Sequence, residues 1–194
     1  MVAASSHWRS ESFLYKTTCV GGAKDNSIQL ETLQNLNNDW RVTFKFADNI
    51  TETLIFPTLI DWTTHADDRV KYYSGAAIYK NEFSYKKNND QKIQNRRIYL
   101  ELDSVNEMAL VRINGQKICT LWSRPFRADI TDAIRNGKNT VELETVNHWA
   151  NRIIGDANLP ESKRKTKTNI KRLNQKSPLL KSGLTGNIKI KQEM

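Results

Sequence analysis

Three tryptophans each have carboxylate, amide or guanidinium side chains close by in the sequence. The residues of these groups are Trp62, Trp122, Arg124, Trp149, Asn151, Arg152 and Asp156. An indole ring can stack on the C–H face of a sugar while such polar groups bond its hydroxyls. The alternative is a structural role, because tryptophan is highly buried on average. For Trp40, which alternates with Val42 and Phe44, the structural role is predicted.

Carboxylates are the second class of side chain that could do chemistry. Hydrolysis of a glycosidic bond needs two of them, one as proton donor and one as nucleophile or base. The candidates are Asp61, Asp67, Asp68, Glu101 and Asp156. Asp67 and Asp68 are neighbours, so on a strand they would point to opposite faces. None of the others has an evident partner, and we predict no catalytic residue in this chain.

Metal and redox chemistry find little support in the sequence. His7, His65 and His148 are scattered, which is poor evidence for zinc, and no acidic loop has a recognisable calcium-ligand spacing. Cys19 and Cys119 make no metal motif and no disulfide framework. Cys119 is interpreted as a small buried apolar residue. We therefore predict no required cofactor and leave a structural calcium ion open.

The positive charge of the chain is concentrated in one segment. Lys and Arg outnumber Asp and Glu by 30 to 21, and seven of the basic side chains lie between Lys163 and Lys176 with no acidic one. Most runs of like charge are solvated loops, which is the favoured interpretation. The alternative is attraction to a polyanion such as an acidic polysaccharide. The run has no aromatic side chain for base stacking, so nucleic acid is not predicted as a partner.

Short alternating segments predict an all-β fold. Mostly apolar side chains share one face at a period of two in six segments, 40–46, 77–83, 98–102, 109–113, 141–145 and 188–190. This is the period of a strand with one buried face. Asn114-Gly115 predicts a hairpin turn, and 129–134 predicts one helical turn that Gly137 ends. The expected fold is an antiparallel β-sandwich or jelly roll with one short helix.

Two segments lack this alternation of apolar side chains. Residues 1–26 are interpreted as an N-terminal extension or the tail of a preceding domain, and residues 27–194 as the sandwich domain. Within that domain, 157–178 is expected to form a polar, basic loop, and a loop of this length is usually functional or disordered. No apolar stretch approaches the roughly 20 residues of a membrane span. The first residues lack the pattern of a secretory signal peptide.

Seven motifs occur in order along the chain. They are LIDWT (59–63), YSGAAIYKNEF (73–83), VRING (111–115), LW (121–122), PFRADIT (125–131), NHWANRIIGD (147–156) and SGLTG (182–186). From about residue 40 to the end, this arrangement resembles the C-terminal sugar-binding sandwich of family 106 glycoside hydrolases, the α-L-rhamnosidases. The motifs between 111 and 146 are similar to family 2 enzymes as well.

The resemblance implies a galactose-binding-like jelly roll that accompanies a catalytic (β/α)₈ barrel, itself roughly 250 residues long. The implied role is non-catalytic: the domain would buttress the barrel and contact a rhamnose-containing or acidic polysaccharide. An extracellular or periplasmic location is implied too, because exported polysaccharide-degrading enzymes usually carry such domains. Two other functions stay open, a small intact glycoside hydrolase and a polyanion-binding module.

The NRIIGD motif allows two roles for its charged residues. Arg152 could pair with Asp156 and tie down the loop that follows, which is the favoured role, or both could reach into a pocket shared with the barrel. Three sites depart from the family pattern: Cys119 stands for Gly, Asn187 for Pro, and Asp103-Ser104 for a Leu-Gly-like step. These departures indicate a divergent member whose ligand need not be that of the family.

Overall fold

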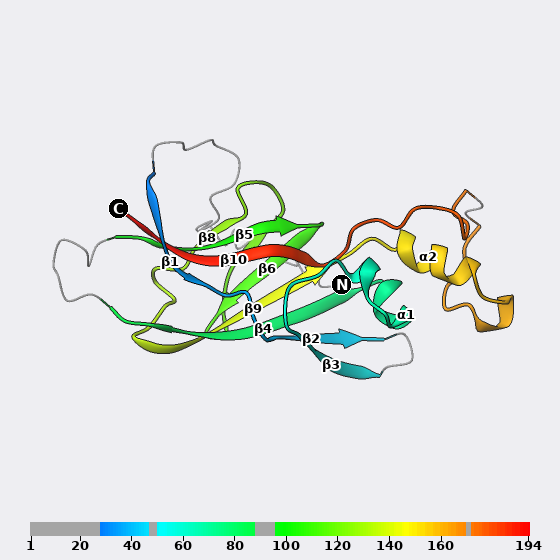
Figure 1. Ribbon diagram of the computed structural model, residues 1–194, viewed down its shortest axis with the longest axis horizontal. Helices are drawn as coiled ribbons and strands as arrows, with labels where there is room; N and C mark the ends of the chain where they lie inside the picture. The colour runs from blue at the N-terminus through cyan, green and yellow to red at the C-terminus, as the bar shows by residue number, and fades with distance from the viewer. Residues whose placement is uncertain (1–27, 47–49, 88–95, 170–171) are drawn as a thin grey trace, which may run out of the picture.

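The computed structural model describes residues 28–46, 50–87, 96–169 and 172–194, which form a two-sheet β-sandwich (Figure 1). One sheet has the strand order β1-β10-β5-β8 and the other β3-β2-β4-β9-β6-β7, with antiparallel pairing throughout. The strands are β1 Leu30–Asn35, β2 Trp40–Lys45, β3 Thr51–Phe56, β4 Ala76–Tyr85, β5 Ile98–Val105, β6 Met108–Ile113, β7 Gln116–Leu121, β8 Arg127–Asp129, β9 Gly137–Val146 and β10 Leu184–Glu193. The predicted all-β antiparallel sandwich is confirmed.

The core lies between the two sheets. In β2, Trp40, Val42 and Phe44 are fully buried and alternate with more exposed residues, as their period-two spacing predicts. Leu100 of β5 and Ile190 of β10 are buried from the opposite sheet. Burial of apolar surface at about 25 cal/mol per Å² is the main favourable term in such a fold. The structural role predicted for Trp40 is confirmed.

The Asn-Gly turn is also confirmed. Asn114 and Gly115 join β6 to β7 with φ values of 52° and 81°, the positive angles that this turn requires. The Asn114 amide donates to the carbonyl of Ala133 and to Oδ1 of Asn139, each at 2.8 Å. Asn139 is fully buried, so the hairpin is tied to the start of β9 and, through Ala133, to the turn before it.

The helical turn predicted at 129–134 is present as a single hydrogen-bonded turn and does not form a helix. Oδ1 of Asp129 accepts from the Thr131 N–H at 3.0 Å, as a capping residue would. The amides of Ala133 and Ile134 both donate to the Ile130 carbonyl, and the chain then leaves for β9. Only two residues separate Ile134 from β9, which begins at Gly137, so the turn has no room to extend. The helices present are α1 Asp68–Lys71 and α2 Ala150–Ala157, with 3₁₀ turns η1 Trp62–Thr64 and η2 Glu161–Lys163.

Helix α2 and the chain that follows it project from one end of the sandwich, at the right of Figure 1. After α2 ends, the described residues of 158–183 contain η2 and no further helix or strand before β10. The N-terminal extension predicted for residues 1–26 lies outside the described residues.

Ion pairs cover the outer face of the four-stranded sheet. Glu101 accepts from Arg127 at 2.6 Å and from Lys191 at 2.5 Å, and Lys189 donates to Asp103 at 3.0 Å. Burial raises the pKa of Glu101, but hydrogen bonds from Lys191 and Arg127 outweigh it and hold this pKa below its ordinary value. These three cations therefore each have a carboxylate partner, which leaves a neutralised surface.

Cys119, in β7, is buried and disulfide-bonded. Its burial agrees with the sequence prediction, whereas the disulfide contradicts it, because a hundred-residue spacing carries no pairing signal. The chain's other cysteine, Cys19, lies outside the described residues. We expect a thiol assay on denatured, unreduced protein to read zero and on reduced protein to read about two. Any thiol titrated before reduction would contradict the disulfide.

Candidate functional site

The DWT and SGLTG motifs meet at the end of the sandwich that carries α2. Oδ1 of Asp61 accepts from the backbone N–H of Thr63 at 3.0 Å and from that of Ser182 at 3.1 Å. The backbone N–H of Trp62 donates in turn to the Ser182 carbonyl at 3.2 Å. A carboxylate that accepts two backbone N–H groups is a strong local tie. Asp61 thus joins two segments about 120 residues apart in the sequence.

Trp62 lies in the core and has no exposed surface. Its indole N–H donates to the Tyr79 hydroxyl at 2.6 Å, and the ring stacks on Tyr79 at 6.3 Å and packs edge-on against Phe44 at 5.2 Å. Gly183 covers the indole so closely that a Cβ there would lie 2.5 Å from Trp62 Nε1. A sugar cannot stack on this ring as the chain is folded, so Trp62 has the structural role that the sequence left open.

Asn151 ties α2 to the segment before β10. It is fully buried. Its amide donates to the Leu180 carbonyl at 2.7 Å and to the Ser182 hydroxyl at 2.9 Å, and its Oδ1 accepts from the Leu180 N–H at 2.8 Å. All these bonds are internal, so Asn151 positions the helix and presents no free edge to a ligand.

Arg152 and Asp156 form an ion pair along α2, with Nη2 of Arg152 2.8 Å from Oδ1 of Asp156. The other carboxylate oxygen accepts from the Lys165 N–H at 3.1 Å, from the Thr166 N–H at 2.7 Å and from the Thr166 hydroxyl at 2.6 Å. Burial raises the pKa of Asp156, but these bonds and the Arg152 charge hold it below its ordinary value. Asp156 therefore ties the loop at Lys165 and Thr166 to α2.

A glycine lets α2 approach the sandwich closely. A Cβ on Gly155 would lie 2.5 Å from Cγ of Tyr72, so any larger residue would push the helix outward. The Arg152 guanidinium lies 6.0 Å from the centre of the same ring. Nε of Arg152 is buried without a hydrogen-bond partner among the described residues, which leaves one donor unused at the edge of this contact.

Exposed apolar side chains lie along the outer face of the six-stranded sheet. Trp122 is 75% exposed and follows Leu121 of β7, while Met108 of β6 pairs directly with Val146 of β9. We call Trp122, Met108 and Val146 the outer apolar row. The chain runs from Val146 into α2, and Trp149, the residue just before this helix, is 51% exposed.

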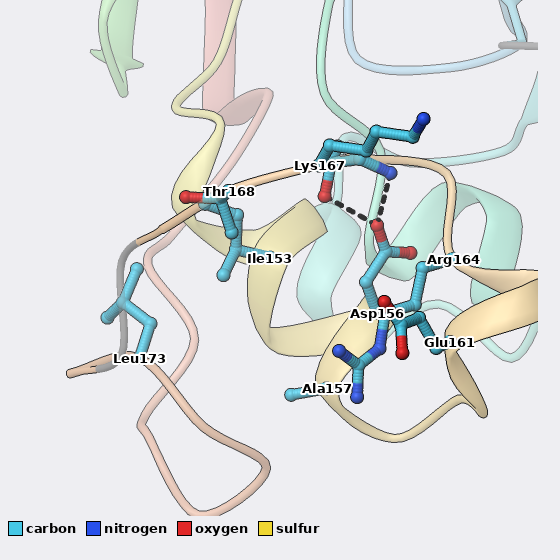
Figure 2. Close-up of a pocket in the computed structure, with 9 residues that line it drawn as sticks. Ile153, Asp156, Ala157, Glu161, Arg164, Lys167, Thr168 and Leu173 are labelled. Carbon is cyan, nitrogen blue, oxygen red and sulfur yellow. Dashed lines mark hydrogen bonds between the residues drawn. The ribbon is translucent and has the colours of Figure 1, made fainter.

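A cavity of about 680 Å³ lies between α2 and the loop that follows it (Figure 2). Ile153, Asp156 and Ala157 line it from the helix. In Figure 2, Arg164 and Glu161 lie on one side of the helix and Thr168 and Leu173 on the other. Its mouth therefore combines aliphatic, hydroxyl and charged groups.

The structure brings some of the predicted site residues together and separates others. Asn151, Arg152 and Asp156 share α2, whereas Arg124 follows β7 and packs its guanidinium 5.3 Å from the Phe126 ring. Trp62 is buried in the core. Sugar contact by Trp122, Arg124, Trp149 and Arg152 stays a prediction. Within the described ranges, no group of three or more His, Cys, Asp or Glu is placed to hold a metal ion, and no helix is long and apolar enough to cross a membrane.

Sequence reasoning missed the partners of these residues. Ser182 and Thr166 complete the bonds of Asn151 and Asp156, and Tyr79 completes those of Trp62. Ser182 stands in a motif that the sequence singled out, but Thr166 lies in the basic run, where no pattern distinguishes it from its neighbours.

Comparison with known proteins places the chain in a family. The family described as "Glycosyl hydrolase 2 galactose-binding domain-like" matches residues 32–177, most of the chain. The chain belongs to this family. This galactose-binding-like domain has a structural relative in the rhamnosidase from Novosphingobium sp. PP1Y, with a TM-score of 0.76 and 31% identity over 85% of the chain. A protein from Formosa agariphila named "Putative beta-glucuronidase" is 36% identical over 126 residues, 64% of the chain.

More distant relatives share the fold alone. The β-D-glucuronidase from Dictyoglomus thermophilum superposes with a TM-score of 0.58 at 16% identity, over 88% of the present chain and 29% of the glucuronidase. The galactose-binding-like domain spans 15% of the Novosphingobium rhamnosidase and 11% of the Formosa protein. It therefore corresponds to a small part of each of these longer proteins.

Two of the departures from the family pattern contact each other. Oδ2 of Asp103 accepts from the backbone N–H of Asn187 at 2.9 Å and from its side-chain amide at 2.8 Å. Oδ1 of Asn187 accepts from Asn37 at 2.8 Å. Proline, the residue that the family pattern has at position 187, has no N–H to donate. Asp103 and Asn187 therefore form a matched pair in this galactose-binding-like domain. Asp103 lies on β5 and Asn187 on β10.

Proposed function

We propose that the domain is a non-catalytic part of an α-L-rhamnosidase-like glycoside hydrolase, where it supports the catalytic barrel and contacts the sugar substrate. The observation that carries this proposal is the exposed outer apolar row of Trp122, Met108 and Val146. Exposed apolar patches on soluble domains mark interaction surfaces. Trp149, which is 51% exposed, and the partly exposed Arg152 are the residues expected to reach the substrate.

Four of the five candidate carboxylates support a non-catalytic role. Asp61 is tied to two backbone amides, Asp67 to Arg69, Glu101 to two cations, and Asp156 to Arg152 and the loop. A general acid needs a raised pKa. The pKa values of Asp67, Glu101 and Asp156 are instead lowered, each through hydrogen bonds that outweigh the effect of burial. None of these three is equipped to donate a proton near neutral pH.

An extracellular or periplasmic location forms part of the proposal. The disulfide at Cys119 supports it, because disulfides persist in oxidising compartments and are rare in the cytosol.

A chimera of the Novosphingobium rhamnosidase tests the proposal. Its matching segment would be replaced by this domain, and we expect the chimera to hydrolyse an aryl-α-L-rhamnoside while the isolated domain does not. Trp122→Glu should lower the activity of the chimera at least about tenfold, because a charge in an apolar interface is costly, and leave the melting temperature of the isolated domain unchanged, because Trp122 is exposed.

Ile55→Glu is the matched control, since Ile55 is 56% exposed and lies on β3 at the far edge of the same sheet. It should leave the chimera active. Turnover by the isolated domain, or equal loss of activity with both variants, would count against the proposal.

A further inference from the structure

The described parts of the basic run, residues 163–169 and 172–176, make hydrogen bonds that hold their backbone in place. Asp156 fixes Lys165 and Thr166 through three hydrogen bonds of 2.6–3.1 Å. η2 precedes them, and Nε of Arg164 donates to the Leu159 carbonyl at 3.1 Å. Farther along, Oδ1 of Asn174 accepts from the Lys176 N–H at 2.9 Å. The backbone that carries Lys165 and Lys176 and the Arg164 side chain are therefore held by hydrogen bonds.

These cations have no carboxylate partners in the part of the chain that the structure describes. The ion pairs found there involve none of the basic side chains between Lys163 and Lys176. The contrast with the four-stranded sheet is sharp, since Arg127, Lys189 and Lys191 there are paired. An array of unneutralised, positioned cations attracts anions and strengthens their binding.

The cavity under this run is suited to a small charged ligand. Its volume of about 680 Å³ falls within the range of about 300–1,000 Å³ that is typical of ligand sites. Arg164 and Lys167 supply charge, Thr166 supplies a polar group, and Ile153 and Leu173 supply apolar walls. Asp156 also lines it, but Arg152 and the loop amides compensate its charge.

We propose that this cavity binds the carboxylate of an acidic saccharide, with Arg164 and Lys167 as the anion contacts. A guanidinium binds a carboxylate in a two-pronged geometry, and the Arg164 Nη groups remain available after Nε is used. A nucleic acid fits less well, because no aromatic side chain lines the cavity for base stacking. The inference deepens the proposed function and rests on it for a saccharide as the ligand.

Binding of an oligogalacturonide to the full chain, measured by calorimetry at 50 and 200 mM salt, tests this inference. We expect Arg164→Gln with Lys167→Gln to weaken binding at least about tenfold, equivalent to about 1.4 kcal/mol, and wild-type affinity to fall with added salt. Glu161→Gln should strengthen binding about twofold, because it removes the cavity's other carboxylate, which opposes the ligand.

Arg135→Gln with Lys117→Gln is the matched control. Arg135 is exposed and donates from Nε to the Lys138 carbonyl at 3.1 Å, just as Arg164 does to Leu159. Lys117 is exposed on β7. This pair removes the same charge away from the cavity and should change affinity less than about twofold, since screened charges at a distance contribute little.

Four results would overturn the inference: no binding at 50 mM salt, equal affinity for a neutral galactose oligosaccharide, equal loss with the control pair, or equally tight binding of single-stranded DNA. The first three leave the chimera test untouched, because that test relies on Trp122 and not on the cavity. If the chimera were inactive but Arg164→Gln with Lys167→Gln weakened oligogalacturonide binding and the control pair did not, the domain would instead be an acidic-saccharide module outside a rhamnosidase.

Discussion

Replacement of Gly183 by alanine is expected to lower the free energy of unfolding by about 4 kcal/mol. Gly183 has a φ of 80°, where an L side chain is strained, and its Cβ would lie 2.5 Å from Nε1 of Trp62 and 2.8 Å from the Tyr79 hydroxyl. Both neighbours are fully buried and bonded to each other, so neither can move aside cheaply. Urea denaturation followed by fluorescence measures the change.

Gly115→Ala separates the steric effect from the backbone effect. Gly115 has nearly the same φ, 81°, but a Cβ at this position would have no neighbour within 4 Å, so its replacement should cost only about 1 kcal/mol. If the two variants lost equal stability, the close contact between Gly183 and Trp62 would not be the reason for glycine in the SGLTG motif.

Asp156→Asn is expected to lower the free energy of unfolding by about 3 kcal/mol, because it leaves Arg152 without its charge partner and turns an amide toward N–H donors. The loop at Lys165 and Thr166 loses its anchor. We expect faster cleavage by trypsin within the basic run, which is rich in its target residues. Glu82→Gln is the control, since its pair with Lys138 is exposed on both sides and is worth at most about 1 kcal/mol.

The Asp156 effect should depend on pH. The pKa of this carboxyl is lowered from its ordinary value of 3.8 in the folded chain. The stability that it contributes is therefore complete above that value and is lost as the pH falls through the lowered pKa. The difference between wild type and Asp156→Asn should be largest near neutral pH and shrink in acid. A difference that stayed constant down to strongly acidic pH would contradict a role for the charge.

The motifs shared with glycoside hydrolases serve first to build one junction. Asp61 of LIDWT, Asn151 of NRIIGD and Ser182 of SGLTG are joined by direct hydrogen bonds. The junction holds α2 against the sandwich, and α2 follows the exposed Trp149 and anchors the basic run. The predicted sugar-contact residues thus divide into a buried supporting group and an exposed group.

The sequence by itself determined the sandwich, because alternation of apolar side chains is a local property that a strand converts directly into a buried face. The 40–46 segment and the Asn114-Gly115 turn are clear cases. The same logic predicted one helical turn at 129–134, and this stays a single turn because β9 begins at Gly137 and leaves no room for it to extend. This logic missed 150–157, because eight residues are too few to form a stable helix by themselves. Burial of Asn151 and the close approach of Gly155 to Tyr72 show that tertiary contacts stabilise this helix.

Only the tertiary structure decided which tryptophan is buried, which charges are neutralised and where the cavity lies. Trp62 and Trp122 have similar polar neighbours in the sequence, yet one has no exposed surface and the other is 75% exposed. Asp156 finds its partners at Lys165 and Thr166 because the loop folds back on α2. Such contacts depend on the approach of distant segments, and no local pattern of residues records which of them will meet.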